Sequence, residues 1–193
     1  MKNFTILGFI LISLITKAQE KASVEKNLYG VQLGIVNTSF YYETKLDRKI
    51  SLRTELGLEL ISSTIDYADP AIEDKITTQF SPYLTLEPRW YYSLDRRKKL
   101  KKNITNNSSN YLSLRTTYGF NKSPLIKNGD FDIVPALSII PKFGIRRVFA
   151  KHFNYEFSGG IGYQYNVISK TEGCDCEHNN TTIDIQARIG YDF

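Results

Sequence analysis

The stretch TIDIQARIGYDF, from Thr182 to Phe193, alternates strictly between apolar and polar residues. Successive side chains of a β-strand point to opposite faces, so this segment would have one apolar face and one polar, partly charged face. The apolar face would carry Ile183, Ile185, Ala187, Ile189, Tyr191 and Phe193, and the other face Asp184, Gln186, Arg188, Gly190 and Asp192. The pattern therefore predicts a strand with a different environment on each side.

The same alternation recurs in seven earlier segments. We predict eight strands, at residues 28–36, 38–46, 49–61, 77–94, 110–120, 132–146, 152–167 and 181–193. In all of them the charged residues keep to one face. Strands of roughly ten residues with this period, separated by turns, are typical of membrane-spanning barrels. The predicted fold is therefore all-β, an eight-stranded antiparallel up-and-down transmembrane β-barrel.

A soluble barrel is the alternative to this arrangement. Soluble barrels keep their apolar residues inside around a ligand and their charges in water. Here the opposite face carries too many charges for a dry core, and the apolar face is larger than a soluble monomer exposes. The sequence favours an apolar band in contact with lipid, with the sheet closed so that no backbone edge stays unpaired.

The amino terminus indicates export. Lys2 precedes the apolar run Phe4 to Ile15, and Thr16 and Ala18 are small residues where a signal peptidase cleaves. The run is shorter than the roughly 20 residues of a spanning helix. We predict a signal peptide at residues 1–18, a single barrel domain at 19–193, and localisation in the outer membrane of a Gram-negative bacterium.

The connections fit a barrel whose amino terminus lies in the periplasm. Short periplasmic turns are predicted at 46–49 and 148–151, and longer outer loops at 62–76, 121–131 and 168–180. The connection 95–109 is long and basic, yet falls on the periplasmic side. Proline removes a hydrogen bond from a strand ladder, so we expect bulges or interrupted pairing at Pro82, Pro88, Pro135 and Pro141.

The polar face predicts a charged barrel interior. Its acids and bases nearly balance, and an eight-stranded barrel is just wide enough for side chains to fill. Unpaired charges there would be costly, so mutual pairing into a structural ionic plug is expected, with a gated narrow pore as the alternative. The predicted acids are Glu43, Glu55, Glu59, Glu87, Glu156, Asp184 and Asp192, and the predicted bases are Lys45, Arg53, Arg89, Arg115, Lys142, Arg146 and Arg188.

The segment Glu172 to His178 contains Cys174 and Cys176 in a predicted outer loop. An oxidising envelope favours a disulfide between these cysteines or an intermolecular bridge. Metal capture is the alternative, because thiolates, an imidazole and carboxylates lie close together there. The spacing is not a standard zinc pattern, and no cofactor is expected.

Catalysis requires a nucleophile or base with an orienting partner. His152 and His178 are the two histidines, and the predicted topology places them at opposite membrane faces. The sequence therefore predicts a protein that is not an enzyme. An enzyme acting on lipid or envelope substrates, with His178 as base beside Glu177 or Ser169, is the alternative.

The chain resembles the small eight-stranded outer-membrane barrels of the OmpA and OmpX type, and the outer-membrane β-barrel domain proteins of Bacteroidota. The resemblance lies in the signal peptide, the strand count, the Gly-rich patches 30–34 and 159–162, and the ending Tyr191-Asp192-Phe193. It implies a location in outer-membrane lipid and a Phe193 that is read by the barrel-assembly machinery, and it fixes location better than activity. From the whole sequence we expect a monomer with a structural or surface-interaction role, whose extracellular or cell-wall ligand is unidentified.

The formal net charge of +5 owes much to the basic run Arg96 to Lys102. A nucleic-acid partner is not expected for an exported protein. The run is either a solvated loop or a surface that attracts anionic phospholipid headgroups or cell-wall polymer.

Overall fold

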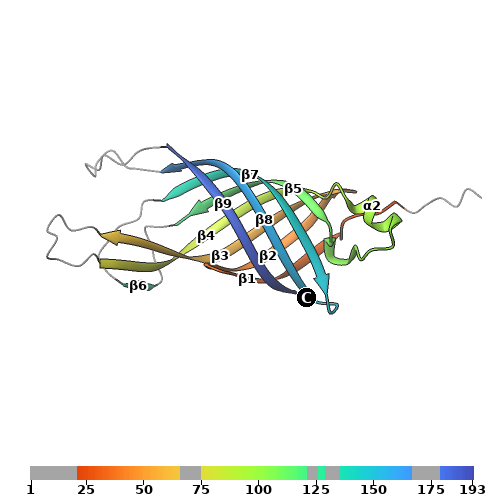
Figure 1. The fold of residues 1–193 in the computed structure, drawn as a ribbon, viewed down its shortest axis with the longest axis horizontal. Helices are drawn as coiled ribbons and strands as arrows, with labels where there is room; N and C mark the ends of the chain where they lie inside the picture. The colour runs from red at the N-terminus through yellow and green to blue at the C-terminus, as the bar shows by residue number, and fades with distance from the viewer. Residues whose placement is uncertain (1–20, 66–74, 121–125, 129–134, 167–178) are drawn as a thin grey trace, which may run out of the picture.

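The computed structural model describes residues 21–65, 75–120, 126–128, 135–166 and 179–193. Within these residues, eight antiparallel strands form a closed barrel (Figure 1). The wall strands are β1 (Asn27–Gly34), β2 (Asn37–Asp47), β3 (Ile50–Ile65), β4 (Lys75–Trp90), β5 (Asn110–Gly119), β7 (Ala136–Phe149), β8 (Phe153–Asn166) and β9 (Asn179–Asp192).

Each wall strand pairs with the next along the chain, and the ring closes between β1 and β9. There Gly30 lies opposite Asp192 and Gly34 opposite Arg188. A short strand, β6 (Ile126–Asn128), pairs with Thr78–Phe80 of β4, beyond the point where β5 ends. The prediction of an all-β, eight-stranded antiparallel barrel is confirmed.

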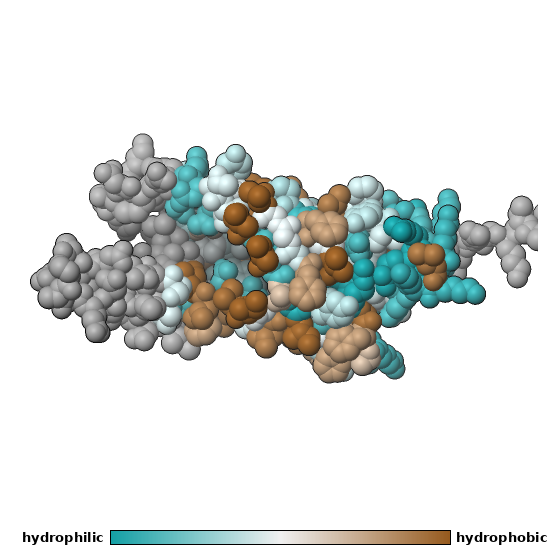
Figure 2. Space-filling model, viewed as in Figure 1, coloured by the Kyte–Doolittle hydropathy of each residue, from teal (hydrophilic) through white to brown (hydrophobic). Residues whose placement is uncertain are grey.

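The two faces of the wall differ as the alternation predicts. In β2, Ser39, Tyr41 and Glu43 are buried, whereas Phe40 and Tyr42 are exposed. Apolar side chains gather on the outer wall in Figure 2, and hydrophilic ones at the end that carries the only labelled helix of Figure 1. The barrel thus has its charges inside and its apolar residues outside.

Prolines interrupt the ladder at two of the predicted places. Pairing between β4 and β5 breaks off after Leu86–Thr116 and resumes at Arg89–Ser113, which brackets Pro88. Pairing between β7 and β8 likewise skips Pro141. Pro82 lies where the β4–β5 ladder begins, and Pro135 precedes β7. The one register shift in the β2–β3 ladder falls between Lys45 and Asp47, away from any proline.

Four predicted strand ends are wrong by three or more residues. The third strand continues to Ile65 rather than ending at residue 61, which shortens the predicted outer loop 62–76. The fourth strand ends at Trp90 rather than at residue 94, because Tyr91 and Leu94 turn inward and are completely buried. The sixth predicted strand begins only at Ala136 and continues to Phe149, which shortens the following turn to residues 150–152. The connection after β4 contains the helix α2 (Leu94–Lys99) and the 3₁₀ turn η1 (Thr105–Asn107), where sequence reasoning expected a loop.

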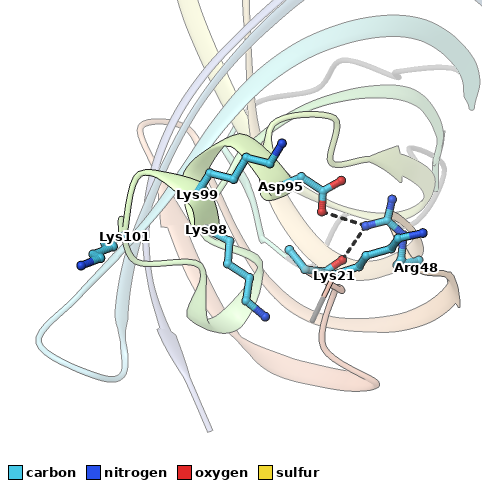
Figure 3. Close-up of a pocket in the computed structure, with 7 residues that line it drawn as sticks. Lys21, Arg48, Asp95, Lys98, Lys99 and Lys101 are labelled. Atoms are coloured by element: carbon cyan, nitrogen blue, oxygen red, sulfur yellow. Dashed lines mark hydrogen bonds and ion pairs between the residues drawn. The ribbon is translucent and has the colours of Figure 1, made fainter. Parts of the chain in front are cut away.

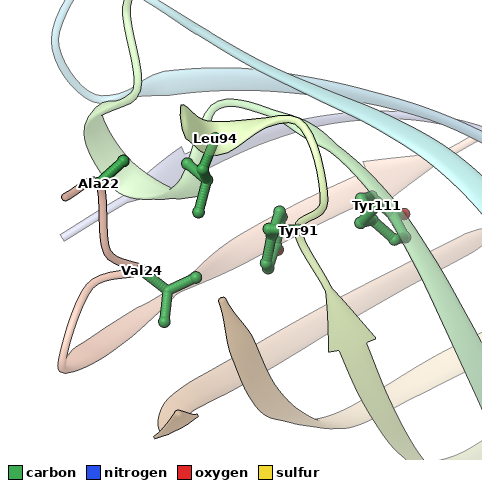
Figure 4. Close-up of a cluster of buried hydrophobic side chains, with 5 residues drawn as sticks. All are labelled: Ala22, Val24, Tyr91, Leu94 and Tyr111. Carbon is green, nitrogen blue, oxygen red and sulfur yellow. The ribbon is translucent and has the colours of Figure 1, made fainter. Parts of the chain in front are cut away.

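This connection and residues 21–26 cover one end of the barrel, which we call the capped end. A small apolar cluster holds the cap together (Figure 4). The other end, which we call the loop end, has the connections that follow β1, β3, β5 and β8. Within the described residues, no helix is both long enough and apolar enough to cross a membrane. The apolar cluster that holds the cap together consists of Ala22, Val24, Tyr91, Leu94 and Tyr111.

Candidate functional site

The centre of the barrel is an ionic network around Glu156 of β8. The guanidinium of Arg89 lies 2.5 Å from its carboxylate, that of Arg53 3.4 Å and that of Arg146 3.7 Å. Gln32 Nε2 adds a hydrogen bond of 2.8 Å. One carboxylate is therefore shared by cations from three other strands.

Glu55 of β3 is a second hub of the network. Its carboxylate is 2.6 Å from Arg53, 2.8 Å from Arg188 and 3.4 Å from Arg115. Glu87 pairs with Arg89 at 2.8 Å. Because ions in a buried site need partners, this mutual pairing is what allows so many charges to fill a narrow barrel.

The network extends towards both ends. On the loop-end side, Lys142 lies 2.8 Å and Arg115 3.9 Å from Asp184. On the capped side, Arg146 lies 2.7 Å from Asp192, whose carboxylate also accepts hydrogen bonds from Tyr41 and Asn154.

Three inward-facing glycines lie directly opposite tyrosines on neighbouring strands. The pairs are Gly30–Tyr41, Gly57–Tyr83 and Gly144–Tyr111. Each tyrosine ring lies so close to its glycine that a Cβ there would overlap it or come to within about 3 Å of it. An arginine then covers the ring, 3.8 Å from the centroid for Arg53 over Tyr41, 4.3 Å for Arg89 over Tyr111 and 5.9 Å for Arg115 over Tyr83. The lumen is therefore packed as well as neutralised.

Three predicted interior residues lie outside the ion-pair network of the described residues. Glu43 is buried but accepts hydrogen bonds from Ser51 and Asn107 instead. Lys45 is exposed at the capped end, where its Nζ donates to Ser23 Oγ at 2.7 Å. Glu59 lines a cavity near the loop end. The other eleven predicted residues lie inside the barrel in direct ionic contact.

Sequence reasoning missed the contribution of the cap to this network. Asn106 and Asn107 adopt left-handed backbone angles, φ 47° and 60°, which asparagine tolerates better than most residues. Asn106 Nδ2 donates to Asp192 at 3.0 Å, and Asn107 Nδ2 donates to Glu43 at 2.7 Å. The run Asn106-Asn107-Ser108-Ser109 is a turn signal, but nothing local in it identifies these carboxylates as its partners.

The loop-end half of the lumen is hollow. Two cavities of about 370 Å³ and 260 Å³ share Glu59, Tyr83, Thr117, Ser138 and Gln164 in their linings. The lumen is thus packed towards the cap and contains unfilled space towards the loop end.

A cavity of about 650 Å³ lies outside the lumen at the capped end (Figure 3). Lysines of α2 and the turn after it line it, together with Lys21 and Arg48. Asp95 lies 2.8 Å from Arg48 and 2.6 Å from Lys49. The hydrogen bonds from Arg48 and Lys49 lower the pKa of Asp95 to about 2, so this carboxylate stays charged and holds α2 to the β2–β3 turn.

Three other predictions concern the cysteines and histidine of the last outer loop, the terminal Phe193, and His152. Cys174, Cys176 and His178 lie outside the described residues. Phe193 is exposed at the capped end, where its ring stacks on Tyr29 with 5.9 Å between centroids. His152 Nδ1 is 2.9 Å from the carbonyl oxygen of Asp192, and its ring stacks on Tyr191. Within the described residues, no three metal-ligating side chains cluster as a metal site.

Comparison of the chain with models of protein families, with curated proteins and with solved structures found no match.

Proposed function

We propose that this protein is an integral outer-membrane barrel with a non-enzymatic structural or surface-interaction role. The observation that carries the proposal is the two-faced wall. Exposed apolar side chains such as Leu56, Ile161 and Ile185 cover the outside, while the inside contains a nearly neutral ionic network. Lipid is the solvent that suits such a wall, because its outer side chains are apolar. The closed ladder also leaves no backbone edge unpaired, as the hydrocarbon core requires.

Aromatic side chains near the capped end support a membrane interface at that level. Trp90, Phe149, Phe153 and Phe193 are exposed there, and several stack on one another. Aromatic rings of this kind prefer the interface between hydrocarbon and headgroups. With the amino terminus in the periplasm, as the lengths of the connections predict, the capped end would face the periplasm and the loop end the cell exterior.

The interior supports a closed barrel rather than a channel. Glu156 and its three arginines fill the lumen at one level, and Asn106 and Asn107 of the cap cover it at another. An ion would have to break several buried pairs to pass, and breaking such pairs is costly.

The test is heat modifiability of the protein extracted from the outer-membrane fraction. A closed barrel migrates faster on a gel before boiling than after it, and we expect that shift together with no discrete conductance in planar bilayers. Recovery as a freely soluble periplasmic protein would overturn the membrane assignment. Discrete conductance that changes in Arg115→Ala would replace the closed barrel by a narrow channel.

A further inference from the structure

The basic cavity at the capped end is a built feature rather than a loose loop. Leu94, the first residue of α2, is completely buried in the cap cluster, and Asp95 binds Arg48 and Lys49. Arg97 donates two hydrogen bonds to the carbonyl oxygen of Asn103, at 2.7 Å and 3.1 Å. The helix and the turn after it therefore present their lysines from a fixed position.

The lining of the cavity selects an anion. Among the described residues that line it, cations outnumber carboxylates by five to one around a space of about 650 Å³. The carboxylate is itself bound by Arg48 and Lys49. The charged lining residues are Lys21, Arg48, Asp95, Lys98, Lys99 and Lys101 (Figure 3).

The position of the cavity favours a membrane phospholipid as the source of that anion. Trp90 is half exposed at the end of β4, and α2 begins only four residues later. At about 3.5 Å per residue, Leu94 lies at most about 14 Å from Trp90. Since an interfacial tryptophan lies at the level of the lipid headgroups, the cavity borders that layer. Leu100, 55% exposed between the lysines, adds an apolar contact for an acyl chain.

We infer that this cavity binds the phosphate of an anionic phospholipid in the periplasmic leaflet around the barrel. The lysine ammonium groups and Arg48 would contact the phosphodiester, and their aliphatic stems the glycerol region. The inference rests on the proposed membrane location. Its consequence is that an anionic lipid bound at the capped end helps to fix the depth of the barrel in the membrane.

The test is native mass spectrometry of the mature chain, folded in neutral detergent and mixed with equal amounts of phosphatidylglycerol and phosphatidylcholine of the same chain length. We expect about five-fold more phosphatidylglycerol than phosphatidylcholine to remain bound. The variant K98Q/K99Q/K101Q should reduce this preference to below about two-fold. The control K26Q/K45Q/K151Q removes three lysines of the same barrel end that do not line the cavity. This control should keep the preference for phosphatidylglycerol.

Three outcomes would overturn the inference. One is equal retention of the two lipids, and another is an equal loss of preference in both triple variants. The third is binding of inorganic phosphate or purified cell wall through the three cavity lysines without retention of phosphatidylglycerol, because the anion would then come from another source. Heat modifiability of each sample separates these outcomes from failure of the membrane assignment, since a barrel that forms and inserts without lipid preference contradicts only this inference.

Discussion

At the scale of single residues, the lumen depends on small residues as much as on charges. Gly144 of β7 lies opposite Tyr111 of β5, and the tyrosine ring occupies the space where a side chain would be. Arg89 then lies over the other part of the ring, 4.3 Å from its centroid. The absence of one Cβ thus determines where a buried arginine can sit.

We predict that Gly144→Ala lowers the free energy of unfolding by about 1–3 kcal/mol, because the new methyl group would overlap the ring of a fully buried tyrosine. Urea unfolding in detergent, followed by the fluorescence of Trp90, measures the change. Gly159→Ala is the matched control, since a Cβ there meets only the carbonyl oxygen of Asp184 at 3.8 Å. An equal loss in both variants would mean that strand flexibility, rather than the ring, sets the cost.

The Glu156 carboxylate has three cationic neighbours, as many as that of Glu55. We predict that Glu156→Gln lowers the free energy of unfolding by about 3 kcal/mol, because three arginines lose a shared counter-charge in a buried site. Glu43→Gln should cost about 1 kcal/mol, because Glu43 has hydrogen bonds from Ser51 and Asn107 in place of an ion pair. The same unfolding assay compares the two, and a larger loss for Glu43→Gln would contradict a network centred on Glu156.

Which residues face the lumen could be predicted from parity alone, but their partners could not. The partners of Glu156 come from β3, β4 and β7, so their identity depends on strand register and on the curvature of the closed wall. Lys45 has the parity of an interior residue, yet it lies beside the register shift at the end of β2 and reaches Ser23 outside. A sequence pattern contains no information about that shift.

At the scale of elements, alternation located all eight wall strands, and the errors lie at their ends. Residues 91–94 continue an alternating pattern, which is why the fourth strand was predicted to run to residue 94. The chain leaves the wall after Trp90 because Tyr91 and Leu94 find an apolar partner in Val24 of the cap. That partner is about 70 residues away, beyond the reach of any local pattern.

The cap cluster anchors α2. We predict that Leu94→Ala increases trypsin cleavage at the basic residues of α2 by about 30-fold in the folded protein, because about 2 kcal/mol of packing opposes local opening. Leu100→Ala is the matched control, as Leu94 is completely buried and Leu100 is 55% exposed. Cleavage that is equally fast in the unmodified protein and in Leu94→Ala would show that α2 is not anchored by this leucine.

The ion pairs of Asp95 give α2 a dependence on pH. The pKa of Asp95 is lowered from 3.8 to about 2, so the unfolded chain binds the proton more tightly than the folded one. The contribution of these pairs to stability is therefore complete above about pH 4 and is lost as the pH falls through about 2.

Carboxyl ¹³C NMR should show this low midpoint for Asp95. In the double variant R48Q/K49Q the midpoint should return towards its ordinary value, because both hydrogen-bond donors are replaced. An Asp95 midpoint near 4 in the unmodified protein would contradict the pairing.

At the scale of the whole molecule, the apolar wall should tolerate charge only where it meets headgroups. We predict that Leu56→Lys, in the middle of the wall, lowers the free energy of unfolding in lipid by about 2–4 kcal/mol, and that Leu46→Lys at the capped rim lowers it by at most about 1 kcal/mol. Both leucines are 60% exposed, so burial within the protein does not distinguish them. If both variants were as stable as the unmodified protein, the wall would face water.

The two ends of the molecule also differ in their surfaces and cavities. The cap packs against the ionic network and presents lysines from a fixed helix, whereas the loop-end half of the lumen contains cavities of about 370 Å³ and 260 Å³. The capped side therefore presents a closed, basic surface, whereas the lumen keeps unfilled space on the side of the loop end.

The closure between β1 and β9 has a consequence for the order of folding. Its ladder covers only Gly30 to Gly34 on β1, whereas the β3–β4 ladder runs from Ile50 to Ile65. Gly30 and Asp192 are about 160 residues apart in sequence, and contacts between such distant residues form late because the intervening chain must be ordered first. The hairpins should therefore form early and the circle should be completed last. The same short seam is where the finished barrel should open sideways first, a lateral gate between the first and last strands of the wall.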